Sequence, residues 1–243
     1  MGAFSRVRRL ARIAGTVTIV GGALTLIWVV VVWRWEDPFT AIQTYFAQKD
    51  LRADYARRSR VFQLTLPVDG KHSAAVAWRA VGRAAHKYDA SLRTGDPVGR
   101  LKIGRIGLSI YVVEGTDHES LKKGPGHYPA SKLPGQGHLV YIAGHRTTYL
   151  APFSHIDDIR IGDYMTMTVP YGRFTYRAVR HYVVPADDLA VLRPTGKEIL
   201  RLQACYPRFF ATHRYLVDAN LVSFSPSGAS VTYQRGQSSA ASG

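Results

Sequence analysis

The pattern of apolar and polar positions divides the chain into three parts. Residues Ile13 to Trp33 form a run of apolar and small residues without a single charge. From residue 36 to about residue 95 the chain is charged, Ala-rich and short of Gly, and the stretches 40–60 and 74–88 consist largely of good helix formers. From about residue 97, apolar and polar residues alternate in short segments separated by Gly and Pro, which is typical of strands.

The uncharged run is typical of a membrane-spanning helix. A helix rises about 1.5 Å per residue, so about 20 residues cross a hydrocarbon core of about 30 Å. Four arginines precede the run, which predicts a cytoplasmic N-terminus. A cleaved signal peptide is the alternative, but the run is long and no small-x-small cleavage site follows it. We expect a basic cytoplasmic tail at residues 1–12 and an uncleaved signal anchor at residues 13–33, with the rest of the chain outside the cell membrane.

The alternating segments predict an all-β barrel or sandwich, because their spacing and their Gly and Pro turns are typical of these folds. We expect this domain at residues 97–226, with single helical turns at 118–123 and 152–159. A stalk or linker, helical or partly ordered, precedes it at residues 34–96, and a disordered tail follows at residues 227–243. The segments with the strand pattern are 99–113 (two strands), 138–143, 164–169, 173–184, 198–204 and 215–224.

Charge and histidine pattern narrow the class of partners. The formal net charge of +15 attracts polyanions, including nucleic acid, anionic lipid and anionic cell-wall polymers. The membrane span favours lipid and wall over nucleic acid, so we expect no nucleic-acid partner. The nine histidines form no HxH or HExxH pattern, and acidic residues are few and scattered. We expect no metal and no cofactor.

Three side chains at predicted strand ends supply the parts for acyl transfer. Cys205, the one cysteine, cannot form an internal disulfide; it closes a strand as a nucleophile would, or it is a small buried hydrophobe. His145 opens the loop after an apolar strand, where an imidazole can exchange protons with a substrate. Arg214 begins the return strand beside Cys205 if 198–205 and 215–224 are antiparallel neighbours, and a guanidinium there can stabilise an oxyanion. The competing cations are Arg146 and Arg208.

Four short motifs are far more specific than these single residues. They are Gly124-Pro-Gly-His-Tyr-Pro, Leu133-Pro-Gly-Gln-Gly, Ile142-Ala-Gly-His-Arg-Thr-Thr-Tyr and Ala151-Pro-Phe. With them the sequence resembles the sortases over residues 98 to 225, most closely the class E type of high-GC Gram-positive bacteria. The resemblance implies a mainly β fold, an eight-stranded barrel with short helices, and His145, Cys205 and Arg214 as catalytic residues.

One segment departs from the family's pattern. Sortases usually carry Thr-Leu-x-Thr-Cys at the nucleophile, whereas this chain has Arg-Leu-Gln-Ala-Cys at residues 201–205. The position before the cysteine helps to shape the substrate pocket in the family, so the alanine bears on motif preference. The candidate substrate-binding residues are Ala204, Tyr206 and Thr147.

The resemblance implies a two-step reaction on secreted proteins that carry a sorting signal of the LPxTG or LAxTG kind. Cys205 attacks the Thr–Gly bond, Arg214 stabilises the oxyanion and His145 protonates the departing amine. An amine of a peptidoglycan precursor or a pilin lysine then resolves the thioacyl enzyme. One alternative is a non-catalytic wall-binding or assembly protein on the same fold, which the missing threonines suggest. Another is an L,D-transpeptidase, although the segment around Cys205 lacks the Ser-His-Gly-Cys setting of those enzymes.

Overall fold

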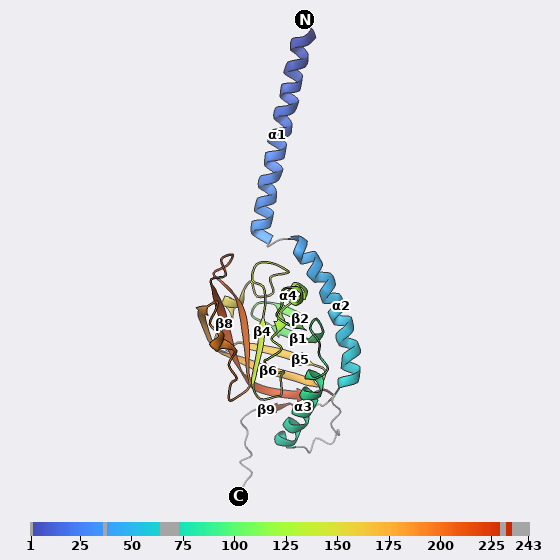
Figure 1. The fold of residues 1–243 in the computed structure, drawn as a ribbon, viewed down its shortest axis with the longest axis vertical. Coiled ribbons are helices and arrows are strands. Elements are labelled where there is room, and N and C mark those ends of the chain that lie inside the picture. The colour runs from blue at the N-terminus through green and yellow to red at the C-terminus, as the bar shows by residue number, and fades with distance from the viewer. Residues whose placement is uncertain (1, 36–37, 64–72, 229–231, 235–243) are drawn as a thin grey trace. The chain divides into compact units, whose positions relative to one another are not determined.

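The structure is a computed structural model that describes residues 2–35, 38–63, 73–228 and 232–234. It divides into two compact units, Met1–Phe39 and Thr40–Gly243. The first unit consists mainly of the helix α1 (Gly2–Trp35), and the second holds a β-barrel with its helices (Figure 1).

Helix α1 contains the apolar run identified in the sequence. Its segment Arg8–Val31 is long and apolar enough to cross a membrane, and it is the one such helix within the described residues. Its large apolar side chains are exposed, for example Leu24 at 60% and Ile27 at 59%. A helix that is apolar on all sides requires an apolar environment. A membrane anchor has this environment permanently in the bilayer, and a signal sequence has it during translocation.

Eight strands close into a mixed barrel, which confirms the fold that the resemblance implies. Around the sheet the order is β6-β5-β1-β2-β3-β4-β7-β8, and pairing of β6 with β8 closes it. The pairs β2–β3 and β4–β7 are parallel, and the other pairs in the barrel are antiparallel. The strands are β1 (Pro97–Ile103), β2 (Leu108–Glu114), β3 (Gly126–His127), β4 (Leu139–Ala143), β5 (Tyr164–Val169), β6 (Gly172–Pro185), β7 (Ile199–Tyr206) and β8 (His213–Pro226).

Alternation along the strands fills the barrel, because successive side chains project to opposite faces. In β5, Met165, Met167 and Val169 are buried in the main core while the residues between them are not. In β7, Leu202 and Ala204 lie in the same core. The short helices are α4 (His118–Lys123), η1 (Ile156–Asp158) and η2 (Leu189–Leu192).

The residues expected to form a stalk contain two helices that pack on the barrel. Helix α3 (Ala74–Asp89) places Ala77, Val81 and Tyr88 in the main core, at spacings that align on one helix face. Helix α2 (Pro38–Phe62) runs beside β1, β2 and α4 (Figure 1). Its Gln48 amide accepts from the N–H of Tyr111 at 2.8 Å and donates to the carbonyl oxygens of Tyr111 and Lys123. These bonds fix one face of α2 against β2 and the end of α4.

Two of the motifs that carry the resemblance have structural roles. The N–H groups of Gly135 and Gly137, both at positive φ, donate to the buried carboxylate of Glu198 at 2.9 and 3.0 Å. In the first motif, His127 Nδ1 lies 2.7 Å from Glu114 Oε2, and both side chains are almost fully buried. The motifs therefore hold the barrel together where β2, β3 and β7 begin or end.

The C-terminal part corrects one expectation. The short strand β9 (Tyr233–Gln234) pairs with β8, and the ring of Tyr233 stacks on Phe224 at 5.2 Å. The prediction of a disordered tail at 227–243 is therefore wrong for these two residues, because composition does not reveal an aromatic partner in a distant strand. Residues 229–231 and 235–243 of that tail lie outside the described residues.

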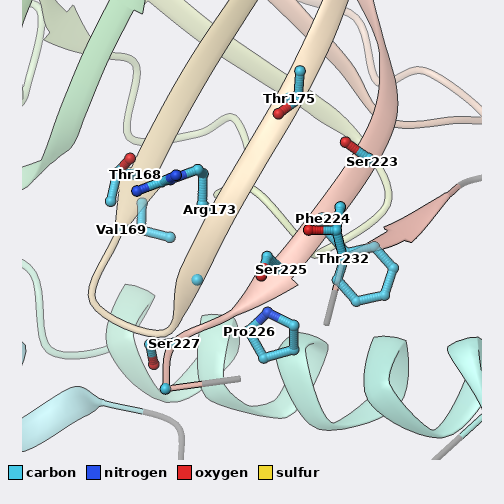
Figure 2. A pocket seen from close by; sticks show the side chains of 12 residues that line it. Thr168, Val169, Arg173, Thr175, Ser223, Phe224, Ser225, Pro226, Ser227 and Thr232 are labelled. Atoms are coloured by element: carbon cyan, nitrogen blue, oxygen red, sulfur yellow. The ribbon is translucent and has the colours of Figure 1, made fainter. Parts of the chain in front are cut away.

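A polar hollow of about 480 Å³ opens where β8 ends and where the β5–β6 turn lies. Figure 2 shows Arg173, Thr175 and Ser223 around it, with Ser225 and Pro226 at its lower edge. Cys205, near the end of β7, and Arg214, near the start of β8, lie together at the other end of the barrel. This hollow is therefore separate from the site described next.

Candidate active site

Strand register brings the three predicted catalytic residues to one rim of the barrel. In the antiparallel pair β7–β8, Cys205 lies directly opposite Arg214. Residues paired in this way project to the same face, with Cβ atoms about 5 Å apart. In the parallel pair β4–β7, Ala143 lies beside Gln203, so His145 and Cys205 each follow the same rung by two residues. The thiol, the guanidinium and the imidazole thus belong to one strand-end cluster.

The loop that carries His145 is fixed at both sides. The N–H of Gly144 donates to the carbonyl of Gln203 at 2.9 Å, which extends the β4–β7 ladder by one bond. The carbonyl of His145 accepts from the N–H of Phe153 at 3.0 Å. A Cβ on Gly144 would lie 2.5 Å from the ring of Phe153, so glycine is required for this close approach. The Ala-Gly-His motif therefore positions the imidazole next to β7.

The imidazole of His145 is half-buried, and burial lowers its pKa from the ordinary value of 6.5. The neighbouring His118 adds to this lowering, because a second positive charge there is unfavourable. The ring of Tyr149 lies 5.1 Å away, and Nε2 is buried without a hydrogen-bond partner. At neutral pH the ring is therefore largely uncharged.

Backbone strain is concentrated in the two loops beside the site. Within the described residues, non-glycine residues with positive φ are confined to Tyr149, Leu150 and Ala151 after β4 and to Phe209 and Ala211 after β7. Such conformations are unfavourable for residues with a Cβ, and they persist where surrounding structure enforces them. The exposed rings of Phe209 and Phe210 lie on the second of these loops. The loops beside Cys205 are thus the strained part of the barrel.

Arg146 links the histidine loop to the cysteine, a role that the sequence did not reveal. Its Nη1 donates to the carbonyl oxygen of Cys205 at 3.3 Å, and its Nη2 donates to Asp157 at 2.6 Å. The guanidinium also lies 5.5 Å from the ring centre of Tyr206 and 6.0 Å from that of Tyr215. The side chain is only 3% exposed, so it is a fixed strut rather than a free donor.

Among the three candidate cations, Arg214 is the one that faces Cys205 across a strand pair. Its Nη1 donates to the carbonyl oxygens of Ala211 and His213 at 2.7 and 3.0 Å, which holds the side chain at the start of β8. Arg208 donates instead to the carbonyl of Ser154, and Arg146 is held as described above. Arg214 is therefore the best placed of the three to meet an oxyanion on a substrate bound at Cys205.

A second apolar cluster lies on the Cys205 face of the strands, outside the main core. Tyr141 and Ala143 of β4 and Leu216 of β8 belong to it, and register places them next to Arg201 and Gln203. The hydroxyl of Tyr141 donates to the side chain of Gln203. The full cluster consists of Leu139, Tyr141, Ala143, Val191 and Leu216, with Tyr128, Tyr182, Val184 and Leu192 against it.

The arginine that replaces the usual threonine forms a buried ion pair. Nε and Nη2 of Arg201 lie 2.6 and 2.8 Å from the two carboxylate oxygens of Asp218 in β8, and both residues are buried. Nη1 of Arg201 donates to the carbonyl of Val191 at 2.5 Å. Arg201 therefore ties η2 to the strand that carries Cys205. The alternation Arg-x-Gln-x-Cys already puts these three side chains on one face, but the acid partner is not evident from sequence.

The candidate substrate-binding residues have different outcomes. Ala204 is only 1% exposed and packs in the main core, because it alternates with Cys205 along β7. A role in shaping the substrate pocket stays a prediction and would act through this packing. Tyr206 is 37% exposed at the end of β7, and Thr147 is half-buried in the histidine loop. Both remain accessible to a ligand at the rim. Among the described residues, no three His, Cys, Asp or Glu side chains gather as metal ligands would.

Comparison with known proteins identifies the family. The sortase domain family matches residues 101–222. Sortase D of Bacillus subtilis is 34% identical over 139 residues, which are 56% of this chain and 69% of that protein. Sortase A of Bacillus anthracis is 24% identical over 74% of this chain and 80% of that protein.

Solved structures agree with this assignment. A sortase E of Streptomyces avermitilis is 33% identical, with a TM-score of 0.50, over 55% of this chain and 93% of that one. A Clostridium perfringens sortase D5 transpeptidase shares the fold with a TM-score of 0.57 and 22% identity, over 72% of this chain and 98% of that one. The resemblance drawn from the four motifs is confirmed, and the L,D-transpeptidase alternative falls away. The chain belongs to the sortase family and is a cysteine transpeptidase.

Proposed function

We propose that this chain is a membrane-anchored sortase that cleaves an LPxTG- or LAxTG-like sorting signal between Thr and Gly through a Cys205 thioacyl intermediate. The observation that carries the proposal is the direct β7–β8 pairing of Cys205 with Arg214, with His145 at the same rim. A thiol, a permanent cation and an imidazole at one strand-end cluster are the groups that acyl transfer requires.

In the first step neutral His145 accepts the thiol proton of Cys205 as the sulfur attacks the carbonyl carbon of the threonine. The negative charge that develops on the carbonyl oxygen is stabilised by the guanidinium of Arg214, which stays charged throughout the reaction. The C–N bond then breaks, and protonated His145 delivers its proton to the leaving glycine amine. The products are a thioester on Cys205 and a peptide with a free amino terminus.

In the second step an amine attacks the thioester, and His145 removes a proton from it. The lowered pKa of His145 suits this half of the cycle, because the neutral ring is the base. The amine belongs to a peptidoglycan precursor or to a pilin lysine. The sulfur leaves as the thiol, and the threonine carbonyl is joined to the acceptor.

The second apolar cluster supports the position of the nucleophile strand. Tyr141, Val191 and Leu216 pack on the Cys205 face of the strands and are at most 8% exposed. They therefore hold β7 in place and do not form an open surface for the signal. Arg201, held by Asp218, borders this cluster.

Helix α1 supports the proposed anchor. Its exposed apolar segment Arg8–Val31 matches the thickness of a bilayer, and the arginines at its start favour a cytoplasmic N-terminus. The catalytic barrel then lies outside the cell membrane, where secreted proteins and wall precursors meet. The N-terminal sequence of the mature protein distinguishes an anchor, which retains residues 13–33, from a cleaved signal peptide, which loses them.

Incubation of the full chain with LPxTG and LAxTG peptides and a glycine-based amine acceptor tests the function. We expect cleavage between Thr and Gly and an acyl–acceptor product by mass spectrometry. Cys205→Ala removes the nucleophile and should abolish both products. Cleavage by the alanine variant at the wild-type rate would refute the proposal. Alkylation of the wild-type chain gives a second test: protection of Cys205 by the peptide supports an enzyme, whereas a thiol that does not react favours the non-catalytic binding protein.

A further inference from the structure

Helix α2 has one face that packs on the barrel and one face that is exposed. One face is fixed to the barrel: Thr44 donates to the carbonyl of Lys122 at 2.8 Å, Gln48 bonds β2, and Leu51 is buried. The other face is exposed and carries Ile42 at 58%, Tyr45 at 63% and Phe46 at 58% exposure. Three large apolar side chains exposed side by side on one helix face are typical of a surface that binds a partner.

A basic hollow lies directly after this apolar group. It encloses about 300 Å³ between α2 and the β1–β2 hairpin, and its cations are Lys49, Arg52 and Arg100. No carboxylate lines it, and the next acidic residue on α2, Asp50, points about 100° away from Lys49 because a helix has 3.6 residues per turn. The remaining lining residues are Tyr45, Gln48, Ser109 and Tyr111.

The donors of this hollow are arranged for an anion with several oxygens. Nε of Arg100 donates to the hydroxyl of Ser109 at 3.0 Å, which orients the guanidinium along the hairpin. The amide of Gln48 is already bonded on both sides, so it forms a wall rather than a donor. Two guanidinium groups and one ammonium group around one cavity match the geometry and charge of a phosphate group.

We propose that the hollow binds the phosphate of an anionic phospholipid headgroup, with Ile42, Tyr45 and Phe46 inserted at the adjacent membrane interface. Positions 42, 45, 46, 49 and 52 follow the i, i+3, i+4, i+7 pattern, so the apolar and basic groups form one continuous stripe. A stripe with aromatic residues at one end and cations at the other is typical of surfaces that lie in a membrane interface. A soluble polyanion matches the cations but leaves the apolar group without a partner.

The stripe follows the proposed membrane span closely in the sequence. Helix α1 ends at Trp35, α2 begins at Pro38, and the stripe begins at Ile42. The membrane contact rests on the proposed membrane anchor, whereas the charge and exposure of the stripe do not.

Photo-labelling of the full chain in nanodiscs tests the site and the anchor separately. One phosphatidylglycerol probe carries a diazirine in the acyl chain and reports on α1; a second carries it in the headgroup and reports on the hollow. We expect headgroup labelling of peptides that span 42–52 and 100–111, with much less labelling from a phosphatidylcholine probe. Loss of acyl labelling at 13–33 would contradict the anchor alone.

The matched variants each remove three exposed positive charges. Because each cation near an anionic membrane contributes about fivefold to binding, K49Q/R52Q/R100Q should lower headgroup labelling at least about tenfold. The control R79Q/R83Q/K87Q, on the exposed side of α3, should leave it within about twofold. Equal labelling in the two variants, equal labelling by phosphatidylcholine, or displacement by soluble polyglycerol phosphate would overturn the lipid site.

Discussion

The two ends of the barrel are formed by the same strands but differ in the hydrogen bonding of their buried side chains and in backbone strain. At the end where β1, β4 and β7 begin, buried hydroxyls have partners. Tyr88 donates to the carbonyl of Pro97 at 2.6 Å, Tyr171 to that of Pro134 at 2.7 Å, and Tyr176 to Glu198 at 2.7 Å. That end also holds the polar hollow of Figure 2.

The end that carries Cys205 leaves polar groups unpaired and backbone strained. Among the described residues, four buried side-chain atoms lack a partner; two of them belong to His145 and Arg146, and the others to Ser59 and to Asn220 opposite Ile199. The non-glycine residues with positive φ all follow β4 or β7 and lie beside His145 and Cys205. Such strain persists only where the surrounding structure enforces it, so its clustering here indicates a rim shaped for function rather than for stability.

The largest effect on this comparison comes from Arg214→Ala. Removal of an oxyanion donor lowers kcat by about 100-fold or more, because the donor acts mainly on the transition state. Peptide cleavage kinetics measure it. The matched control is Arg173→Ala, an exposed arginine at the opposite end of the barrel, which should leave kcat within about twofold. A loss under threefold in Arg214→Ala would assign the role to another group.

A smaller effect is expected from Arg146→Lys. Lysine keeps the charge but loses the fork that joins the Cys205 carbonyl to Asp157, so the nucleophile shifts relative to His145. We expect kcat to fall on the order of tenfold while KM changes little, since misplaced reacting groups act on the chemical step. Unchanged kcat in a variant with normal melting temperature would show that the strut has no role in positioning.

The smallest effect concerns the pKa of His145. Burial is the larger cause of the lowered pKa, and His118 is the second. His118→Gln should therefore raise the pKa toward 6.5 without reaching it, because the ring stays buried. The protonated fraction at pH 7 then increases. Titration of the imidazole by NMR measures the shift. The control His155→Gln, an exposed ring beside Asp158, should not change it. A fall in the pKa in His118→Gln would contradict the assigned cause.

The sequence predicted the strands well because period-two alternation is local. Segments 164–169 and 173–184 correspond closely to β5 and β6, and the helical turn at 118–123 coincides with α4. Strand β3 is only two residues long, so no periodicity could reveal it. The packing of α3 on the barrel could not be predicted either. Its apolar spacing indicates a buried face but does not show that this face contacts the barrel core.

The candidate active site also combines features that the sequence predicts with features that it does not. Cys205, His145 and Arg214 could be placed at one rim because each stands at the end of a predicted strand. The buried pair Arg201–Asp218 could not be predicted, since it depends on the β7–β8 register. The strut at Arg146 depends on the conformation of a strained loop. Ala204 lies next to the nucleophile in sequence but projects into the core, because successive side chains of a strand alternate between its two faces.

The role of Cys205 as nucleophile is tested most directly by the intact mass of the full chain during turnover of a sorting-signal peptide without an amine acceptor. We expect an added mass equal to the acyl part of the peptide up to its threonine, located on Cys205 and released by hydroxylamine as a thioester is. An active enzyme that never gains this mass, or that gains it on another residue, would contradict the assignment of Cys205 as nucleophile.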